Sequence, residues 1–314
     1  MKHTGPRQLI CLSLLFSLSA LLSWAQTPAF PIVQGSPQEL VRATVANEIA
    51  PADTALPKHF YLSQKQSSQG VDAKLNVETT EGTAGMLIER NSQPLSGKDL
   101  GEEASRLERL CNNPNDLRRK QRREKEVDEH SQQIVKALPD AFLYEFDGTV
   151  PGTSTVGKKG DTLVRLRFHP NPRYSPPSHV EQVLLGMQGT LLIDQQEHRL
   201  ARIDAQLFRE VSFGWGVLGH LDKGGTFQVD QADVGNGSWE MTRMRLNLTG
   251  KVMMVKSLII KSEETNSDFR HVPDNLTFAK AVELLKSEQG HYESEQARLQ
   301  KEEGARTAEN RNRR

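Results

Sequence analysis

The sequence has few cysteines and no excess of charge of either sign. Only Cys11 and Cys111 occur among 314 residues, and the 40 basic residues are matched by 40 acidic ones. Because Cys11 lies in an N-terminal apolar run, we expect no internal disulfide and interpret Cys111 as a buried or idle thiol. Nucleic-acid binding needs a marked basic excess on one face, so we expect no nucleic-acid partner.

The one long hydrophobic run stands at the N-terminus. Two basic residues precede an apolar segment at 9–22, and Ser23 and Ala25 supply the small residues of a cleavage site. The run is too short for a comfortable membrane span, so it predicts a signal peptide over residues 1–25, cleaved after Ala25; an uncleaved anchor is the alternative. Cleavage leaves 38 basic and 40 acidic residues. We expect a periplasmic or secreted protein without a stable membrane span.

Catalytic and metal-binding motifs are missing. The sequence contains no G-x-S-x-G, H-E-x-x-H or C-x-x-C pattern, no phosphate loop and no calcium loop. The histidines are scattered singly, which is more typical of loops and turns than of a metal site. We therefore predict no catalytic residue, no metal, no cofactor and no enzymatic activity. An acid–base pair brought together from distant strands is the remaining enzymatic alternative.

A glycine pattern at 214–219 matches the dinucleotide fingerprint G-x-G-x-x-G letter for letter. Such a site needs a strand followed by a helix whose N-terminus faces the phosphates. Only six residues separate Gly219 from the next predicted strand, too few for a crossover helix. We interpret the segment as one strand, 209–218, with Phe213 and Trp215 on one face and glycine on the other, which allows bending or close approach by another element.

Serine-led capping patterns predict where three helices begin. These helices are expected at 36–49, from Ser96 to before Pro114, and from Ser178 to about Met187. The segment 114–138 is highly charged, predicts a solvated helical arm ending at Pro139, and completes a helical insertion over 96–138. Beyond the sheet, 276–314 is expected to form a charged helix and a disordered tail.

Alternating apolar and polar residues predict eleven strands. They are expected at 58–66, 72–80, 84–90, 141–149, 161–169, 189–194, 199–207, 209–218, 225–234, 238–248 and 251–263. Short turns, including Thr249–Gly250, connect the later strands, so 189–263 is predicted to be an antiparallel meander. A switch of apolar parity predicts a β-bulge near Thr242–Arg243.

The run from Gly189 to Asp194, its short turn, Arg199 to Ile203, and the later Gly250-Lys-Val-Met resemble the periplasmic lipoprotein-carrier (LolA-like) superfamily, and exported bacterial proteins assigned to it. The resemblance covers residues 36–272. It implies an α+β fold: a curved antiparallel half-barrel of about eleven strands with helices on the concave face. The domain is expected over 26–275, with the charged helical insertion as a departure from true carriers.

The resemblance implies a non-enzymatic binding or carrier protein that holds a lipid, an acyl chain or a lipidated partner in an apolar half-barrel cavity. Apolar strand faces rich in Met, Phe and Trp suit such a cavity, although they also make ordinary cores. The alternative is an envelope interaction or stress-sensor module that has no small ligand and docks a protein through 116–136. The candidate cavity residues are Ile193, Leu207, Phe213, Trp215, Phe227, Trp239, Met241, Met254 and Leu258.

Overall fold

The protein is described by a computed structural model that covers residues 35–49, 57–214, 218–253, 256–292, 294 and 298. The described residues belong to one compact unit, and the predicted signal peptide lies outside them. The helices and strands are α1 (Pro37–Ile49), β1 (Lys58–Ser67), β2 (Gly70–Val77), β3 (Ala84–Arg90), β4 (Gln93–Pro94), α2 (Gly97–Asn112), α3 (Pro114–Ala141), β5 (Phe142–Pro151), β6 (Thr162–Pro170), the 3₁₀ helix η1 (Glu181–Gly186), β7 (Met187–Asp194), β8 (Leu200–Leu207), β9 (Val211–Phe213), β10 (Gly219–Leu221), β11 (Thr226–Asp233), β12 (Trp239–Val252) and β13 (Lys256–Val272). A C-terminal helix, 278–292, follows.

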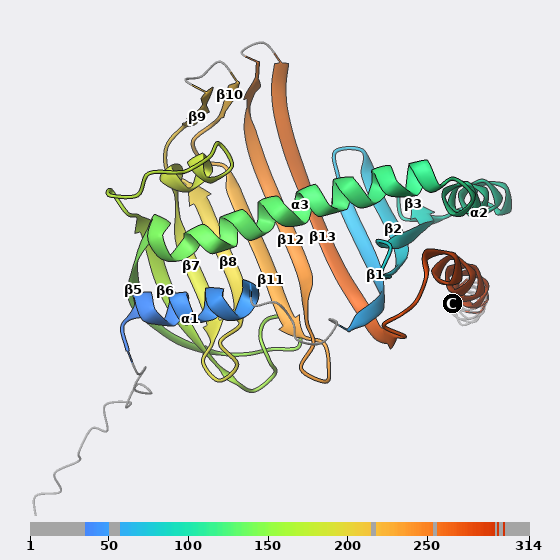
Figure 1. Cartoon of the computed structure of the whole chain (residues 1–314), viewed down its shortest axis with the longest axis horizontal. Helices are drawn as coiled ribbons and strands as arrows, with labels where there is room; N and C mark the ends of the chain where they lie inside the picture. The colour runs from blue at the N-terminus through green and yellow to red at the C-terminus, as the bar shows by residue number, and fades with distance from the viewer. Residues whose placement is uncertain are drawn as a thin grey trace, which may run out of the picture. The chain divides into compact units, whose positions relative to one another are not determined.

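The strands form one open antiparallel sheet in the order β4-β3-β2-β1-β13-β12-β11-β8-β7-β6-β5 (Figure 1). The short strands β9 and β10 form a hairpin that joins the sheet through β12. Apart from this hairpin, the strands from β7 to β13 pair in chain order, which confirms the predicted meander. The α+β class and the open sheet of about eleven strands are also confirmed.

The predicted capping residues hold the first two helices. At α1, the Ser36 N–H donates to the Glu39 carboxylate at 2.8 Å, and the Glu39 N–H donates to the Ser36 hydroxyl at 3.2 Å. Ser96 caps α2 in the same way through the N–H of Asp99. The third helix differs from its prediction: η1 is a 3₁₀ helix that begins at Glu181 and carries no side-chain cap.

The glycine-rich segment 209–218 is not one strand, so that prediction was wrong. The chain leaves β9 at Gly214, whose φ is +55°, and returns as β10 from Gly219, whose φ is +133°. A Cβ on Gly219 would lie 2.1 Å from the carbonyl oxygen of Lys251 in β12. Glycine is therefore required here for a left-handed backbone and for close approach of a neighbouring strand.

Two further expectations were wrong. Thr249–Gly250 is not a turn, because β12 runs through both residues to Val252 and pairs with β13 from Arg243 onward. The helix α3 passes Pro139 and ends at Ala141, with the proline in its last turn. The predicted bulge is confirmed: the pairing of β11 with β12 shifts between Arg243 and Met241 and leaves Thr242 as the extra residue.

The helix α3 is anchored at both ends of the sheet. Near its start, the Glu124 carboxylate accepts the N–H of Thr83 beside β3 at 3.2 Å. Near its end, the Tyr144 hydroxyl of β5 donates to the carbonyl of Leu138 at 2.7 Å. From Glu124 to Leu138 the helix rises about 21 Å, whereas the nine inter-strand spaces from β3 to β5 measure about 43 Å along the sheet. The sheet must therefore curve around α3, which spans its concave face.

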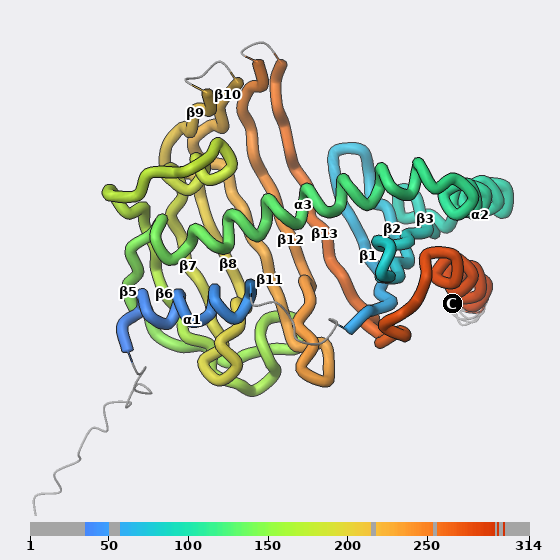
Figure 2. Tube along the Cα trace, in the orientation of Figure 1, coloured from blue at the N-terminus to red at the C-terminus, as the bar shows by residue number. Residues whose placement is uncertain are grey.

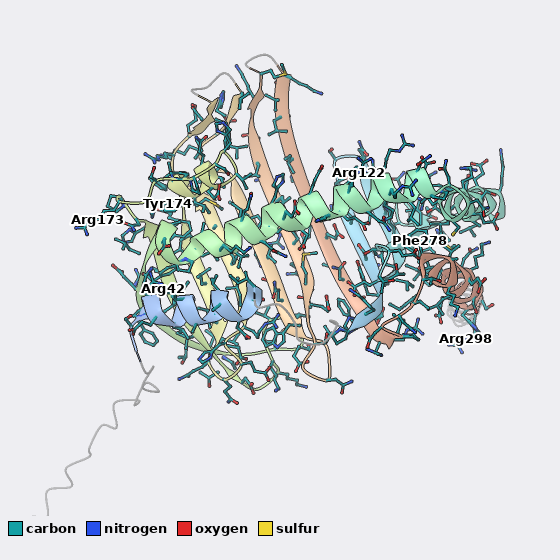
Figure 3. All side chains as sticks on the ribbon, viewed as in Figure 1. Arg42, Arg122, Arg173, Tyr174, Phe278 and Arg298 are labelled. Atoms are coloured by element: carbon teal, nitrogen blue, oxygen red, sulfur yellow. The ribbon has the colours of Figure 1, made fainter. Side chains whose placement is uncertain are left out.

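Apolar packing concentrates at the two ends of the sheet. At the β5–β8 end, α1 lies beside the last turns of α3 (Figure 2), joined to it by an Arg42–Asp140 ion pair at 3.1 Å. At the β1–β3 end, the C-terminal helix packs on the opposite face of the sheet, through Phe278, Val282 and Leu285. Figure 3 labels Phe278 at the start of this helix. The central strands lie between these two cores.

Candidate functional site

One row of paired residues shows which face of the central strands looks toward α3. Leu246 pairs with Phe227, which pairs with Ala205. The row continues through Gly189 and Phe168 to Tyr144. Directly paired residues share a face of a sheet. Because Tyr144 donates its hydroxyl to α3, the whole row lies on the concave face.

The concave face of the central strands is apolar and only partly buried. Val229 pairs with Met244, and Leu248 pairs with Ile260, so these side chains join Phe227 and Leu246 on this face. Each has intermediate exposure, although residues of this size usually reach full burial in a core. We define this set as the central apolar surface: Phe227, Val229, Met244, Leu246, Leu248, Leu258 and Ile260.

The middle of α3 crosses the sheet without packing onto it. Every residue from 125 to 133 is exposed, including Val127, which is 67% exposed. The buried residues of α3 all lie in its last turns: Leu138, Pro139 and Ala141. In Figure 1, α3 runs in front of the central strands from one end of the sheet to the other. The helix thus spans the central apolar surface but does not bury it.

The opposite face of the same strands is charged. Arg202 of β8 forms a bidentate ion pair with Asp230 of β11, with distances of 2.6 and 2.8 Å. Glu263 of β13 binds Arg245 at 2.9 Å and lies 3.4 Å from Arg243. Asp230 is buried in its pair with Arg202, whereas Arg243, Arg245 and Glu263 are partly exposed. The contrast leaves the concave face as the apolar side of the central sheet.

Polar groups bound the central apolar surface toward β1. Ser63 donates to the Glu264 carboxylate at 3.0 Å, and Tyr61 stacks on Phe269 with ring centroids 5.4 Å apart. Burial, and then the negative field of Glu78 and other nearby glutamates, raises the pKa of the Tyr61 phenol, so it stays protonated as a hydrogen-bond donor. An apolar chain on this surface would meet hydrogen-bonding groups at this border.

The structure spreads the predicted cavity residues over several environments. Ile193 and Leu207 are fully buried core residues of β7 and β8. Phe227 and Leu258 lie on the central apolar surface. Phe213 is partly buried in β9, which joins the sheet through β10 and β12. Trp215 and Met254 lie outside the described residues.

The remaining two candidates lie near the bulge in β12. Trp239 packs against Leu163 and Leu192 and donates its indole N–H to Glu197 at 3.4 Å. Trp239 is a buried member of this core cluster, 9% exposed, so it is not part of the partly exposed central apolar surface. Met241 is partly buried, directly before Thr242.

Sequence reasoning missed most of the central apolar surface. Met244, Leu246 and Leu248 share one parity in the sequence, and Trp239 and Met241 share the other. The bulge at Thr242 separates the two groups, but alternation alone does not show which group faces the concave side. The concave face is identified by the hydrogen bond from Tyr144 to α3, which the sequence does not show.

Comparison with solved structures finds a likeness in fold. No family model matches the chain, and no curated protein matches it. The crystal structure of a domain from Vibrio parahaemolyticus, described as an outer membrane lipoprotein-sorting protein domain, covers 79% of this chain and 97% of its own length, with 10% identity and a TM-score of 0.28. No helix in the described part of the chain is both long and apolar enough to cross a membrane. At this similarity the likeness transfers no family, ligand, partner or residue role.

Proposed function

We propose that this chain is an exported binding or carrier protein that holds an acyl chain or a similar apolar ligand on the central apolar surface, beneath α3. The observation that carries the proposal is the partial exposure of this surface while both ends of the sheet are packed. Surface apolar patches that persist in a folded protein mark sites of binding. Methionine and phenylalanine adapt well to flexible apolar ligands.

Three features support a lipid-like ligand. The surface runs along three neighbouring strands, which suits a long chain better than a compact molecule. The helix above it presents polar and charged residues at 125–133, which can remain solvated while a ligand lies below. The predicted signal peptide supports export to the cell envelope, where lipids and lipidated proteins occur.

Binding is tested with a fluorescent fatty acid such as parinaric acid, added to the purified chain without residues 1–25. We expect saturable binding that Leu246→Gln weakens by about tenfold, since it removes about 1–2 kcal/mol of apolar contact. Asn247→Gln is the matched control, because Asn247 is exposed on the convex face next to Leu246. Equal loss in both variants, or no saturable binding, would contradict the proposal.

Native mass spectrometry of protein isolated from the envelope supplies a second readout. We expect an apolar species to be retained by the wild type and lost from Leu246→Gln. If no apolar species is found in repeated preparations, the interaction module becomes the favoured function. In that case deletion of 116–136 should abolish capture of a protein partner, because this segment is the exposed part of α3.

A further inference from the structure

Three ionisable side chains meet near the starts of β1 and β12 and the end of β2. His59 lies in β1, Glu240 in β12, and Glu78 directly follows β2. The Nδ1 atom of His59 is 3.1 Å from Oε1 of Glu240 and 3.7 Å from Oε2 of Glu78. One ligand atom from each residue lies within 4.8 Å of the other two. Without a bound ion, such a group is a buried histidine that shares a proton with two carboxylates.

The imidazole of His59 has an unused nitrogen directed into this group. Its side chain is only 5% exposed, yet Nδ1 makes no hydrogen bond. The carboxylate of Glu240 is close to Nδ1 but does not meet the geometry of a hydrogen bond. A buried nitrogen without a partner costs about 1–3 kcal/mol, so its retention needs an explanation.

The distances suit a small divalent cation. Zinc binds histidine nitrogen and carboxylate oxygen at about 2.0–2.2 Å, which places tetrahedral ligand atoms roughly 3.3 Å apart. The measured 3.1 and 3.7 Å lie on either side of this value. One neutral imidazole and two carboxylates also balance the charge of a divalent ion. Nitrogen in the set favours zinc or a similar transition metal over Ca²⁺ and Mg²⁺.

We infer that His59, Glu78 and Glu240 form a three-residue binding site for a divalent transition-metal ion of the zinc class. Three protein ligands leave a fourth position for water or for an oxygen of another ligand. Glu78 is already oriented, because its Oε2 accepts the backbone N–H of His59 at 3.1 Å. Such supporting hydrogen bonds fix metal ligands in place.

The charges around the site are consistent with cation binding. Glu78 and Glu240 bring two carboxyl groups to one position beside the buried imidazole of His59, and a cation would relieve the repulsion between them. The cations Lys58 and Arg199 lie near Glu240, and the ring of His271 lies 6.2 Å from that of His59. Arg199 is held by Glu48 at 3.0 Å, which engages part of its charge.

The test is a titration of the full chain without residues 1–25 by Zn²⁺ alone, read by calorimetry and by metal content after desalting. We expect one Zn²⁺ per chain, with Ca²⁺ and Mg²⁺ much weaker. Glu240→Gln and Glu78→Gln should each weaken binding by at least about tenfold, the loss typical of removing even a supporting group. Co²⁺ should give the visible absorption of a four-coordinate site.

Two control variants separate this site from adventitious binding. Glu264→Gln changes a nearby carboxylate that binds Ser63. His220→Gln changes a second, more exposed group of Glu210, His220 and Asp222. Neither should alter the tight site, and Glu240→Gln should not destabilise the metal-free protein, because it removes a like charge. Absence of tight Zn²⁺ binding, or binding unaffected by Glu240→Gln and Glu78→Gln, would overturn the inference.

Discussion

Glu103 shows how one side chain protects an edge of the sheet. Its carboxylate accepts the N–H of Leu87 in β3 at 2.9 Å, where β4 is too short to pair. Arg106 holds the same carboxylate through two hydrogen bonds of 2.7 and 2.8 Å. Burial alone would raise the pKa of Glu103, but the bonds from Arg106 and Leu87 outweigh it and lower that pKa. A covered edge is also less open to pairing with other chains.

We predict that Glu103→Gln lowers the free energy of unfolding by about 1 kcal/mol at neutral pH, through loss of a charge-assisted hydrogen bond. A lowered folded-state pKa stabilises the protein above the unfolded-state value of about 4.3. The stabilisation is lost as the pH falls through the folded-state pKa. Urea unfolding from pH 7 to pH 3 should therefore show the two proteins converging in acid.

The control for this prediction is Glu102→Gln. Glu102 is exposed, lies next to Glu103, and forms only a 3.9 Å pair with Lys98. It should change the free energy of unfolding by less than about 0.5 kcal/mol at any pH. A pH-independent difference between wild type and Glu103→Gln would show that the carboxylate does not act through its charge.

At the scale of elements, α3 behaves as a solvated rod between two anchors. Its segment 125–133 buries no side chain, so helix propensity and local pairs such as Lys125–Glu129 must hold it. A substitution there should change the stability of the helix without changing its packing on the sheet. The same helix keeps its two ends attached at β3 and β5.

We predict that Val127→Pro destabilises the protein by about 3 kcal/mol, because proline removes a helical hydrogen bond and clashes with the preceding turn. Val127→Ala should stay within about 0.5 kcal/mol of wild type, since Val127 is 67% exposed. Far-UV circular dichroism during thermal unfolding measures both variants. Equal thermal stability of the two variants would mean that this segment is not helical in solution.

At the scale of the whole molecule, two packed ends are joined by central strands with a partly exposed face. The core at the β1–β3 end includes Leu285, which is fully buried in the C-terminal helix. Hydrogen bonds of β12 and β13 connect the ends continuously, but few buried side chains do. Such an arrangement favours separate local opening of one end.

We predict that Leu285→Ala lowers the free energy of unfolding by about 2–5 kcal/mol. It should lower hydrogen-exchange protection more in β1–β3 than in β6–β8. Leu284→Ala is the matched control, because Leu284 is only partly buried at the rim of the same core. Leu284→Ala should lower the free energy of unfolding by clearly less than Leu285→Ala. Uniform loss of protection across the sheet would instead indicate one cooperative unit.

The sequence by itself determined the local features. Serine-led caps placed the starts of α1 and α2, and alternation placed most strands, because these signals depend on neighbouring residues. The parity switch located the bulge at Thr242 for the same reason. The short segment between Gly219 and the next predicted strand excluded a crossover helix. The hairpin of β9 and β10 agrees with this exclusion.

Only the tertiary structure decided which residues face one another. The turn at Gly214 and the extension of β12 through Gly250 depend on strand partners that lie far away in the chain. The anchoring of α3 shows which side of each strand is concave. Alternation in the sequence does not show this, so the sequence-based prediction included Trp239 and left out Leu246. His59, Glu78 and Glu240 come together only through the register of three strands, which no local spacing encodes.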